Sequence, residues 1–308
     1  MSFTTGTATG HNDLLDKLHD YLLAEGWTIE AYTAGVASTD IAELFVTAPG
    51  SLGGEQPRVG FQTYTDVDLN IYTWMMHGAI NYEADKEFGT QQYSSPRVYF
   101  PLWDDVIDYW FYVNDRRVIV VAKIGVIYHS LYAGFFLPYA LPAEYPFPLY
   151  IGGTVNSAQA YNLDNSGMRS AFDPSSAGAC YLKREQNTWE VFENSYNSAG
   201  VSDGFNGGNS VIWPYRTPSG DNDPGGDDFN KYFLNNLRPT LEGHMPMWQA
   251  QIIDISENVM PGMLDGVFVT PGFNRIPEQV VTVAAQDYRL FISHNRTRGK
   301  DFFAIEEI

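Results

Sequence analysis

Three carboxylates lie among aromatic side chains in one short run of the sequence. Asp104, Asp105 and Asp108 lie beside Trp103, Tyr109 and Trp110. Paired carboxylates supply acid and base in carbohydrate-cleaving enzymes, which makes this run a candidate glycan site. The same pattern is typical of a strand, or of the entrance to a helix, with its polar side chains outward and its aromatic side chains inward. Because glycosidase carboxylates usually come from separated segments, we favour the structural interpretation.

A second acidic cluster offers the oxygen ligands that calcium prefers. Asp221, Asp223, Asp227 and Asp228 surround a Pro-Gly-Gly turn, and closely spaced carboxylates can coordinate Ca²⁺. The spacing is not that of an EF-hand, and no glutamate stands at the closing position. We therefore interpret the segment as a solvated acidic loop, with a calcium site as the open alternative.

One segment reverses the acidic character of the chain. Arg296, Arg298 and Lys300 lie close together near the C-terminus of a chain whose formal net charge is -19. Such a basic loop could dock on an acidic patch of a neighbouring copy. Loop tips are commonly charged, so a solvated turn explains the same residues. Both interpretations stay open.

The sequence has no other recognisable constellation for chemistry. It contains no Walker loop, dinucleotide fingerprint, nucleophile elbow or zinc-protease motif. The six histidines form no ligand-like pair, and His129, in an apolar run, is typical of a hydrogen-bonded core residue. The single cysteine, Cys180, excludes an intrachain disulfide and is expected to be a small core residue. We expect a non-enzymatic protein without catalytic residues, metal or cofactor.

The charge is acidic throughout. Residues 1–150 hold 18 acids and 7 bases, a net charge of -11, and the remainder holds 19 acids and 11 bases, a net charge of -8. Neither half offers the basic surface that nucleic acids or anionic membranes require. The first residues lack the charged and apolar regions of a signal peptide, so we expect synthesis in a cytoplasm.

Sequence periodicity predicts the elements that would position these residues. Apolar residues recur at helical spacing over Thr9–Glu25, where Asn12 or Asp13 can cap the helix and Gly26 can end it. The apolar run Val118–Leu137 is about long enough to span a bilayer. It contains Lys123 and His129, however, and we interpret it as two buried strands.

Short runs of β-branched and aromatic residues predict strands in both halves. Asn114 and Asp115 predict a hairpin turn, and Asn230–Leu237 a short helix. The predicted strands are Trp27–Tyr32, Ile41–Ala48, Val59–Tyr64, Leu69–Met76, Val106–Val113, Arg117–Val121, Gly125–Leu131, Ala179–Lys183, Thr188–Phe192, Ser210–Trp213, Met247–Ile255, Gly266–Thr270, Val280–Ile292 and Phe302–Ile308, the last two forming a hairpin.

Together these elements predict an α+β, strand-dominated fold with two domains. In residues 1–150 the N-terminal helix packs on an antiparallel meander. Residues 151–308 form a loop-rich, mainly-β domain that ends in a C-terminal hairpin. We place the boundary near Gly152 and Gly153.

The segment before that boundary is rich in proline and aromatic residues. Four prolines within residues 137–150 disfavour a helix or a central strand, so we expect an extended connector. Its aromatic side chains, Tyr139, Tyr145, Phe147 and Tyr150, are our candidates for the centre of a subunit interface. We expect Tyr145→Ala to leave monomers folded and to impair assembly.

Several stretches at both ends and in the middle of the chain carry a resemblance to known proteins. They are Thr4–Leu18 (TTGTATGHNDLLDKL), Tyr99–Asp104 (YFPLWD), Arg116–Lys123 (RRVIVVAK), Gly134–Ala140 (GFFLPYA), Glu144–Gly153 (EYPFPLYIGG), Tyr288–Phe291 (YRLF) and Asp301–Glu306 (DFFAIE). These stretches resemble a family of virion structural proteins of about 300 residues, encoded in the tail modules of tailed bacteriophages. About residues 154–280 contain no recognised motif.

The resemblance implies a virion location, in the tail or baseplate, and assembly into a ring with adjacent tail proteins as partners. The helix-then-meander start is similar in outline to ring-forming tail-terminator proteins, which favours a sixfold ring of copies. An alternative is a virion-borne receptor-binding, glycan-binding or polysaccharide-active protein, suggested by the carboxylates beside aromatic rings. Fibres and depolymerases usually show repeated β-solenoid periods, and this sequence shows none.

Overall fold

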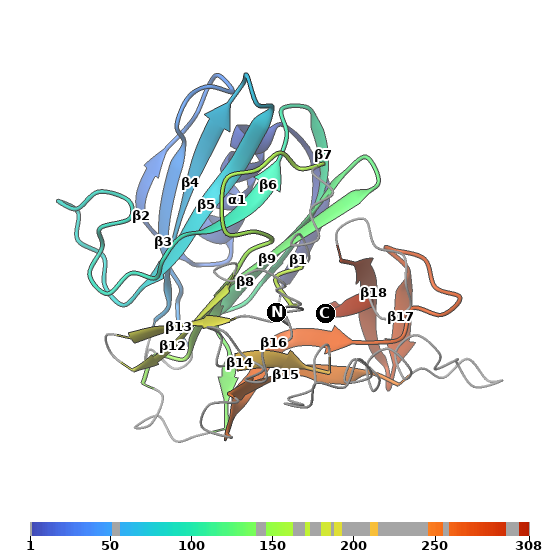
Figure 1. The fold of residues 1–308 in the computed structure, drawn as a ribbon. Coiled ribbons are helices and arrows are strands. Elements are labelled where there is room, and N and C mark those ends of the chain that lie inside the picture. The colour runs from blue at the N-terminus through green and yellow to red at the C-terminus, as the bar shows by residue number, and fades with distance from the viewer. Residues whose placement is uncertain are drawn as a thin grey trace, which may run out of the picture.

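The computed structural model describes residues 2–50, 56–139, 146–162, 170–172, 180–185, 188–192, 210–214, 246–254, 259–293 and 302–307. Within these ranges the fold is strand-dominated, with a single helix and two sheets (Figure 1). All strand pairs are antiparallel except a short contact between β13 (Thr188–Phe192) and β14 (Ser210–Trp213). The predicted strand-dominated, antiparallel architecture is therefore confirmed.

The small sheet is an antiparallel meander near the N-terminus, as predicted. Its strands follow chain order, and each predicted run falls within or overlaps one of them. They are β2 (Thr28–Thr33), β3 (Glu43–Thr47), β4 (Arg58–Asp66), β5 (Ile71–Ala79) and β6 (Val98–Leu102).

The large sheet contains most of the other strands and uses both ends of the chain. Its order is β1 (Ser2–Thr9), β7 (Val106–Val113), β8 (Arg117–Ile124), β9 (Ile127–Phe135), β11 (Leu149–Gly152), β12 (Cys180–Glu185), β13 (Thr188–Phe192), β14 (Ser210–Trp213), β15 (Trp248–Asp254), β16 (Val259–Val269), β19 (Phe302–Glu307), β18 (Gln286–Ile292) and β17 (Val280–Val283), with β10 (Leu137–Pro138) paired to β16.

The strands β7, β8 and β9 form a central layer that is buried on both faces. Trp110 and Tyr112 point into one apolar core with the C-terminal strands. Phe111 and Val113 point into a second core with α1 and the small sheet. A strand covered on both faces reads as a continuous apolar run. This explains Val118–Leu137, which the structure resolves into strands as predicted, and no helix within the described ranges is long and apolar enough to cross a membrane.

The helix α1 (His11–Ala24) follows β1 directly. Its N-cap is Gly10, with φ of 99°, and no side chain caps it. The predicted caps were wrong because Asn12 instead donates a hydrogen bond to the carbonyl oxygen of Ala37, at 2.8 Å. The predicted end is confirmed, since Gly26 follows the last turn with φ of 83°. Leucines of α1 are buried in the second core.

The proline-rich segment departs from the expected connector at both of its described ends. Leu137 and Pro138 pair with β16 as β10. Leu149–Gly152 forms β11, a central strand between β9 and β12. The prolines precede this strand and do not interrupt its ladder, so the expectation against a central strand was wrong there. The large sheet consequently continues through the boundary expected near Gly152 and Gly153.

The predicted strand Val280–Ile292 is two strands. A tight turn at Ala284 and Ala285 separates β17 from β18, and both alanines have positive φ, of 51° and 66°. The predicted C-terminal hairpin is confirmed, because β18 pairs with β19 and places Ile292 opposite Phe302. The predicted helix Asn230–Leu237 lies outside the described residues.

Candidate functional site

Exposed apolar side chains gather at one end of the small sheet, in the loop 34–41 and the turn between β4 and β5. Val36 is 96% exposed, and Ile41, Val67 and Leu69 are each more than half exposed. The hydroxyl of Thr65 donates to the carbonyl oxygen of Ser38 at 2.7 Å, which holds the two loops together. Exposed apolar residues that cluster in this way are typical of an interaction site.

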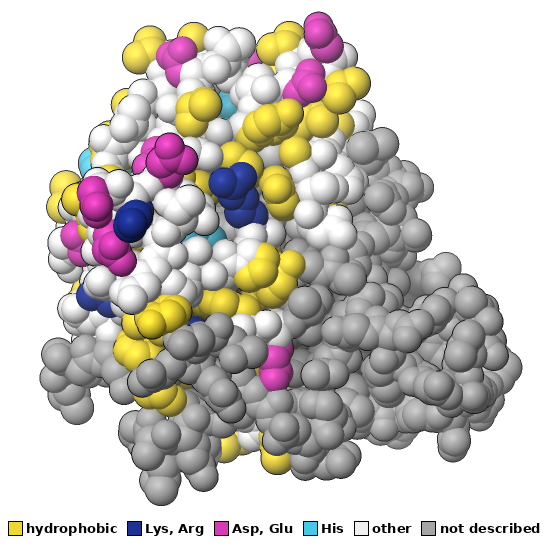
Figure 2. All heavy atoms as spheres, turned by 60° about the vertical axis from the view of Figure 1, so that its left-hand side comes forward, with side chains coloured by type: hydrophobic (Ala, Val, Ile, Leu, Met, Phe, Trp, Pro, Cys, Tyr) yellow, Lys and Arg dark blue, Asp and Glu magenta, His cyan; other side chains and the backbone are white. Residues whose placement is uncertain are grey.

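Carboxylates shape and surround the same loops. Asp40 accepts backbone hydrogen bonds from Val36 and Ala37 at 3.0 and 2.7 Å. Asp66 accepts one from Leu69 at 3.1 Å. Figure 2 shows apolar and acidic side chains together at the top of the molecule, with the Lys and Arg side chains below them. We call this surface, made of Val36, Asp40, Ile41, Asp66, Val67, Asp68 and Leu69, the acidic tip.

The acidic tip is suited to a protein partner rather than to a small anion. Its negative charge favours a basic surface, and its apolar side chains gain from removal from water.

The aromatic run with three carboxylates forms the turn between β6 and β7. The carbonyl oxygen of Asp105 accepts from the backbone N–H of Gly10 at 2.9 Å. Its carboxylate accepts from the backbone N–H of Val106 at 2.7 Å. The indole of Trp103 donates to the carbonyl oxygen of Val106 at 2.9 Å. Asp108 lies within β7, opposite Lys123. The structural interpretation accounts for all of these contacts.

The aromatic residues expected at a subunit interface occupy three different environments. Tyr139 is 53% exposed, and its hydroxyl donates to the side-chain oxygen of Gln251. Phe147 is partly buried. Tyr150 has no exposed surface, and its hydroxyl donates to the carbonyl oxygen of Ala171 at 2.6 Å. Tyr150 is thus corrected from an interface residue to a core residue, because β11 places it inside the large sheet.

The other expected positions fall outside the described residues. These are Tyr145, the basic residues Arg296, Arg298 and Lys300, and the acidic residues Asp221, Asp223, Asp227 and Asp228. Their roles stay predictions. Among the residues that the structure describes, no group of three His, Cys, Asp or Glu side chains could hold a metal ion. Cys180 is buried in the first core, as expected.

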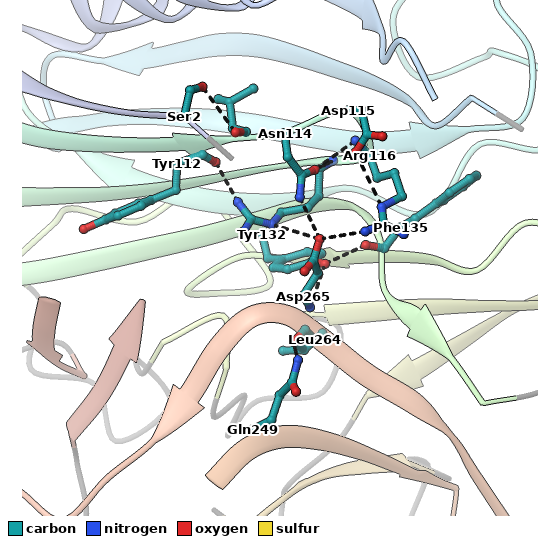
Figure 3. A network of polar contacts seen from close by, with 12 residues as sticks. Ser2, Tyr112, Asn114, Asp115, Arg116, Tyr132, Phe135, Gln249, Leu264 and Asp265 are labelled. Atoms are coloured by element: carbon teal, nitrogen blue, oxygen red, sulfur yellow. Dashed lines mark hydrogen bonds and ion pairs between the residues drawn. The ribbon is translucent and has the colours of Figure 1, made fainter. Parts of the chain in front are cut away.

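A buried charge network joins the β7–β8 hairpin to β16 (Figure 3). Arg117 is fully buried and donates to the carbonyl oxygen of Tyr112 at 3.1 Å. Its Nε lies 3.7 Å from Oδ2 of Asp265. The same oxygen accepts from the side-chain amide of Asn114 at 2.7 Å and lies 3.6 Å from Arg116. Burial lowers the pKa of Arg117, and Asp265 acts in the opposite direction.

Two further polar clusters involve the C-terminal residues, one with the central layer and one within the C-terminal hairpin. Glu278 accepts hydrogen bonds from Lys123 at 2.6 Å and from Tyr128 at 2.5 Å. Burial acts to raise the pKa of Glu278, but these two hydrogen bonds, together with the positive charges of Lys123 and Arg289, hold the pKa below its usual value. Arg289 donates to both carboxylate oxygens of Glu307, at 2.5 and 3.3 Å.

Sequence reasoning missed Asp265, Glu278 and Glu307. The available signal was a lone carboxylate in an otherwise apolar strand, as with Asp265 within Val259–Val269. A buried carboxylate requires a paired charge, but the sequence does not show that Arg117 supplies it. The Asp265 and Glu278 clusters join segments that are distant in sequence, whereas Arg289 with Glu307 joins the neighbouring strands β18 and β19. These are structural roles.

Three histidines are buried in different ways. His129 contacts the carbonyl oxygen of Tyr161 through Nε2 at 3.1 Å, which confirms the predicted core histidine. His11 lies 3.0 Å from the hydroxyl of Thr65, and burial lowers its pKa to about 4. Neither ring nitrogen of His77 has a hydrogen-bond partner. Burial, with a smaller contribution from Arg97, lowers the pKa of His77 to about 3.

His77 is enclosed by side chains on the outer face of the small sheet. Its ring centroid lies 4.3 Å from that of Phe88 and 5.6 Å from that of Phe45. Phe88 comes from the segment between β5 and β6, which therefore covers this face. The neutral imidazole fills space among apolar side chains here, since its charged form would be costly to bury.

The sequence matches no protein-family model, and no curated protein matches it.

Proposed function

We propose that the chain is a non-enzymatic structural subunit of a bacteriophage tail or baseplate. In this proposal, copies of the chain form a symmetric, sixfold ring and connect adjacent virion proteins. The chain is synthesised in the host cytoplasm and functions in the virion. In this proposal the N-terminal helix packs on the antiparallel meander, a loop-rich β region follows, and the large sheet connects the two parts.

The acidic tip is the observation that carries the proposal. Four apolar side chains stand exposed on two loops that carboxylates hold in shape. In a monomer, these side chains would remain in contact with water. A ring subunit presents different patches to its two neighbours, and such patches combine apolar centres with charged rims. The acidic tip has this composition.

The buried polar groups support the same conclusion. Arg117, Asp265, Glu278 and Glu307 all pair charges or hydrogen bonds between strands. These contacts fix the geometry of the large sheet. A function that consists of holding neighbours in register needs such a rigid frame.

A second candidate is a glycan-binding or polysaccharide-active virion protein. One feature favours it: Trp103 is only partly buried, stacks edge-on against Tyr161 at 5.1 Å, and adjoins the exposed Asp104 and Asp105. Aromatic rings beside carboxylates suit sugar recognition. Reproducible binding or cleavage of host surface glycans by the purified chain would favour this candidate over the structural one.

Locating the chain in the intact particle tests the proposal. We expect a cryo-EM reconstruction of the virion to place the chain in a ring around the tail axis. In that ring the acidic tip would be in contact with another protein. A peripheral, receptor-facing position, or absence of the chain from purified virions, would contradict the proposal.

A further inference from the structure

The large sheet ends in two strands that lack an outer partner among the described residues, β1 and β17. In β1, Gly10 just beyond the strand donates to the carbonyl oxygen of Asp105 on the β7 side. Hydrogen-bonded positions alternate along an antiparallel pair. The N–H groups of Phe3, Thr5 and Thr7 consequently point away from β7, at the free edge.

β1 itself has no charge, proline or bulge of the kind that protects an edge strand, and no strand among the described residues pairs with its outer side. Its sequence, SFTTGTAT, has no charged residue and no proline, and Thr5, Thr7 and Thr9 are exposed. Protected edges are short, charged, bulged, interrupted by proline or covered. β1 is eight residues long and pairs with β7 without a register shift.

Both edges of the small sheet show the protection that β1 lacks. β2 contains Glu30 and has a register shift between Ile29 and Ala31. β6 contains Pro101, and its free side is covered because Tyr99 bridges to Val155. Within the described ranges, the chain thus protects both edges of the small sheet and leaves β1 without the same protection.

β17 is the other open end of the same sheet. Its sequence, VVTV, also has no charge and no proline. Leu290 on β18 donates to the carbonyl oxygen of Gln279 at 2.9 Å, so the alternation directs the N–H groups of Val280 and Thr282 outward. Both residues are exposed.

We propose that β1 of one copy pairs with β17 of the next copy, so that the large sheet continues from subunit to subunit. This inference rests on the proposed ring function and names the contact that builds the ring. The two strands are different surfaces of one chain, and pairing them is a head-to-tail contact. Head-to-tail contacts close into rings when the rotation permits, and main-chain hydrogen bonds supply the affinity in strand addition.

Proline at an outward-facing position tests each edge separately. Thr7→Pro removes an outward N–H of β1, and Val280→Pro removes one at the first residue of β17, where proline is tolerated. The matched controls Thr7→Val and Val280→Thr keep the N–H. The mass of each full-length chain would be measured by sedimentation velocity, and its fold by circular dichroism and thermal unfolding.

We expect the wild-type chain and both controls to assemble, and each proline variant to be a folded monomer. An equimolar mixture of the two proline variants retains one intact β1 and one intact β17. It should form heterodimers and nothing larger. If a proline variant fails to fold, Thr7→Lys and Val280→Lys replace it, because a lysine on an edge strand also opposes pairing.

Other results would overturn the inference. Normal assembly of the Val280→Pro variant would show that β17 is not the partner of β1. A mixture that stays monomeric, or a wild-type chain that stays monomeric at high concentration, would exclude the contact itself. Mass spectrometry of purified virions separates this failure from failure of the proposed function. If the chain is found in virions but the proline variants assemble normally, the proposed function stands and the β1–β17 contact is excluded.

Discussion

The guanidinium of Arg117 and the carboxylate of Asp265 lie 3.7 Å apart in the interior, although they belong to β8 and β16. Arg117 has no exposed surface, and Asp265 is almost fully buried. Their contact joins the central layer to the C-terminal strands, as do the hydrogen bonds of Glu278 with Lys123 and Tyr128.

Removing the carboxylate should destabilise the protein strongly. Asp265→Asn removes the carboxylate that lies beside the buried charge of Arg117, and we expect a loss of about 3–5 kcal/mol in the free energy of unfolding. Denaturant titration followed by fluorescence would measure it. Asp68→Asn, at an exposed turn position, is the control and should change stability by less than about 0.5 kcal/mol. Equal effects of the two substitutions would contradict the role of the pair.

Stability should fall in mild acid because of His77. Its folded-state pKa, about 3, lies below the ordinary value of 6.5. The unfolded chain therefore binds a proton that the folded chain excludes as the pH drops below 6.5. We expect each pH unit in this range to remove about 1.4 kcal/mol for this group. His77→Leu should flatten the pH dependence of unfolding by that amount, whereas an unchanged slope would refute the assignment.

Protonation of His11 should also lower the stability in acid, but over a narrower pH range than that of His77. Its folded-state pKa of about 4 also lies below the ordinary value, so its contribution is present above pH 6.5 and is lost toward pH 4. The slope that remains in the His77→Leu variant tests this expectation. Adding a second substitution, His11→Asn, should lower that slope again.

Glycine in the turn between β17 and β18 should stabilise the folded protein. Ala285 has φ of 66°, a left-handed conformation that costs residues with a Cβ. We expect Ala285→Gly to raise the free energy of unfolding by about 0.5–1 kcal/mol. Ala31→Gly, within β2 and without positive φ, should lower it by a similar amount. A loss of stability at both positions would show that the turn is not strained in solution.

The acidic tip should matter for assembly and not for folding. Ile41→Gln with Leu69→Gln replaces exposed apolar side chains, so the free energy of unfolding should change by less than about 0.5 kcal/mol. Phage that depend on this variant should incorporate less of the chain into purified virions. Leu23→Gln, at the far end of α1 and also exposed, is the matched control. Equal incorporation of the Ile41→Gln/Leu69→Gln variant and the Leu23→Gln control would show that the acidic tip is not part of an interface.

Local sequence signals predicted most of the strands. The hairpin at Asn114 and Asp115 and the meander of the small sheet depend on turn residues and on alternation over a few positions, and both are present. The strands of the central layer were found because they are apolar on both faces. These features depend on short sequence segments, in which the periodicity of apolar residues is most informative.

The remainder depends on contacts between distant segments. β1 was not predicted, because SFTTGTAT has no alternation of apolar and polar residues and becomes a strand through β7. The β17–β18 turn was missed because alanine is not a turn residue. β11 was not predicted because prolines close to it in the sequence disfavour a central strand. The acidic tip comes from two loops that meet only in the folded chain.

The two-sided burial of β7, β8 and β9 has a consequence during synthesis. Their face with Trp110 and Tyr112 is covered by strands that follow much later in the chain, and Tyr112 reaches Glu307 near the end. Until those strands have been synthesised, the aromatic face of β7, β8 and β9 is exposed to solvent. Such intermediates aggregate readily, so we expect the chain to need chaperone protection in the cell and dilute conditions for refolding.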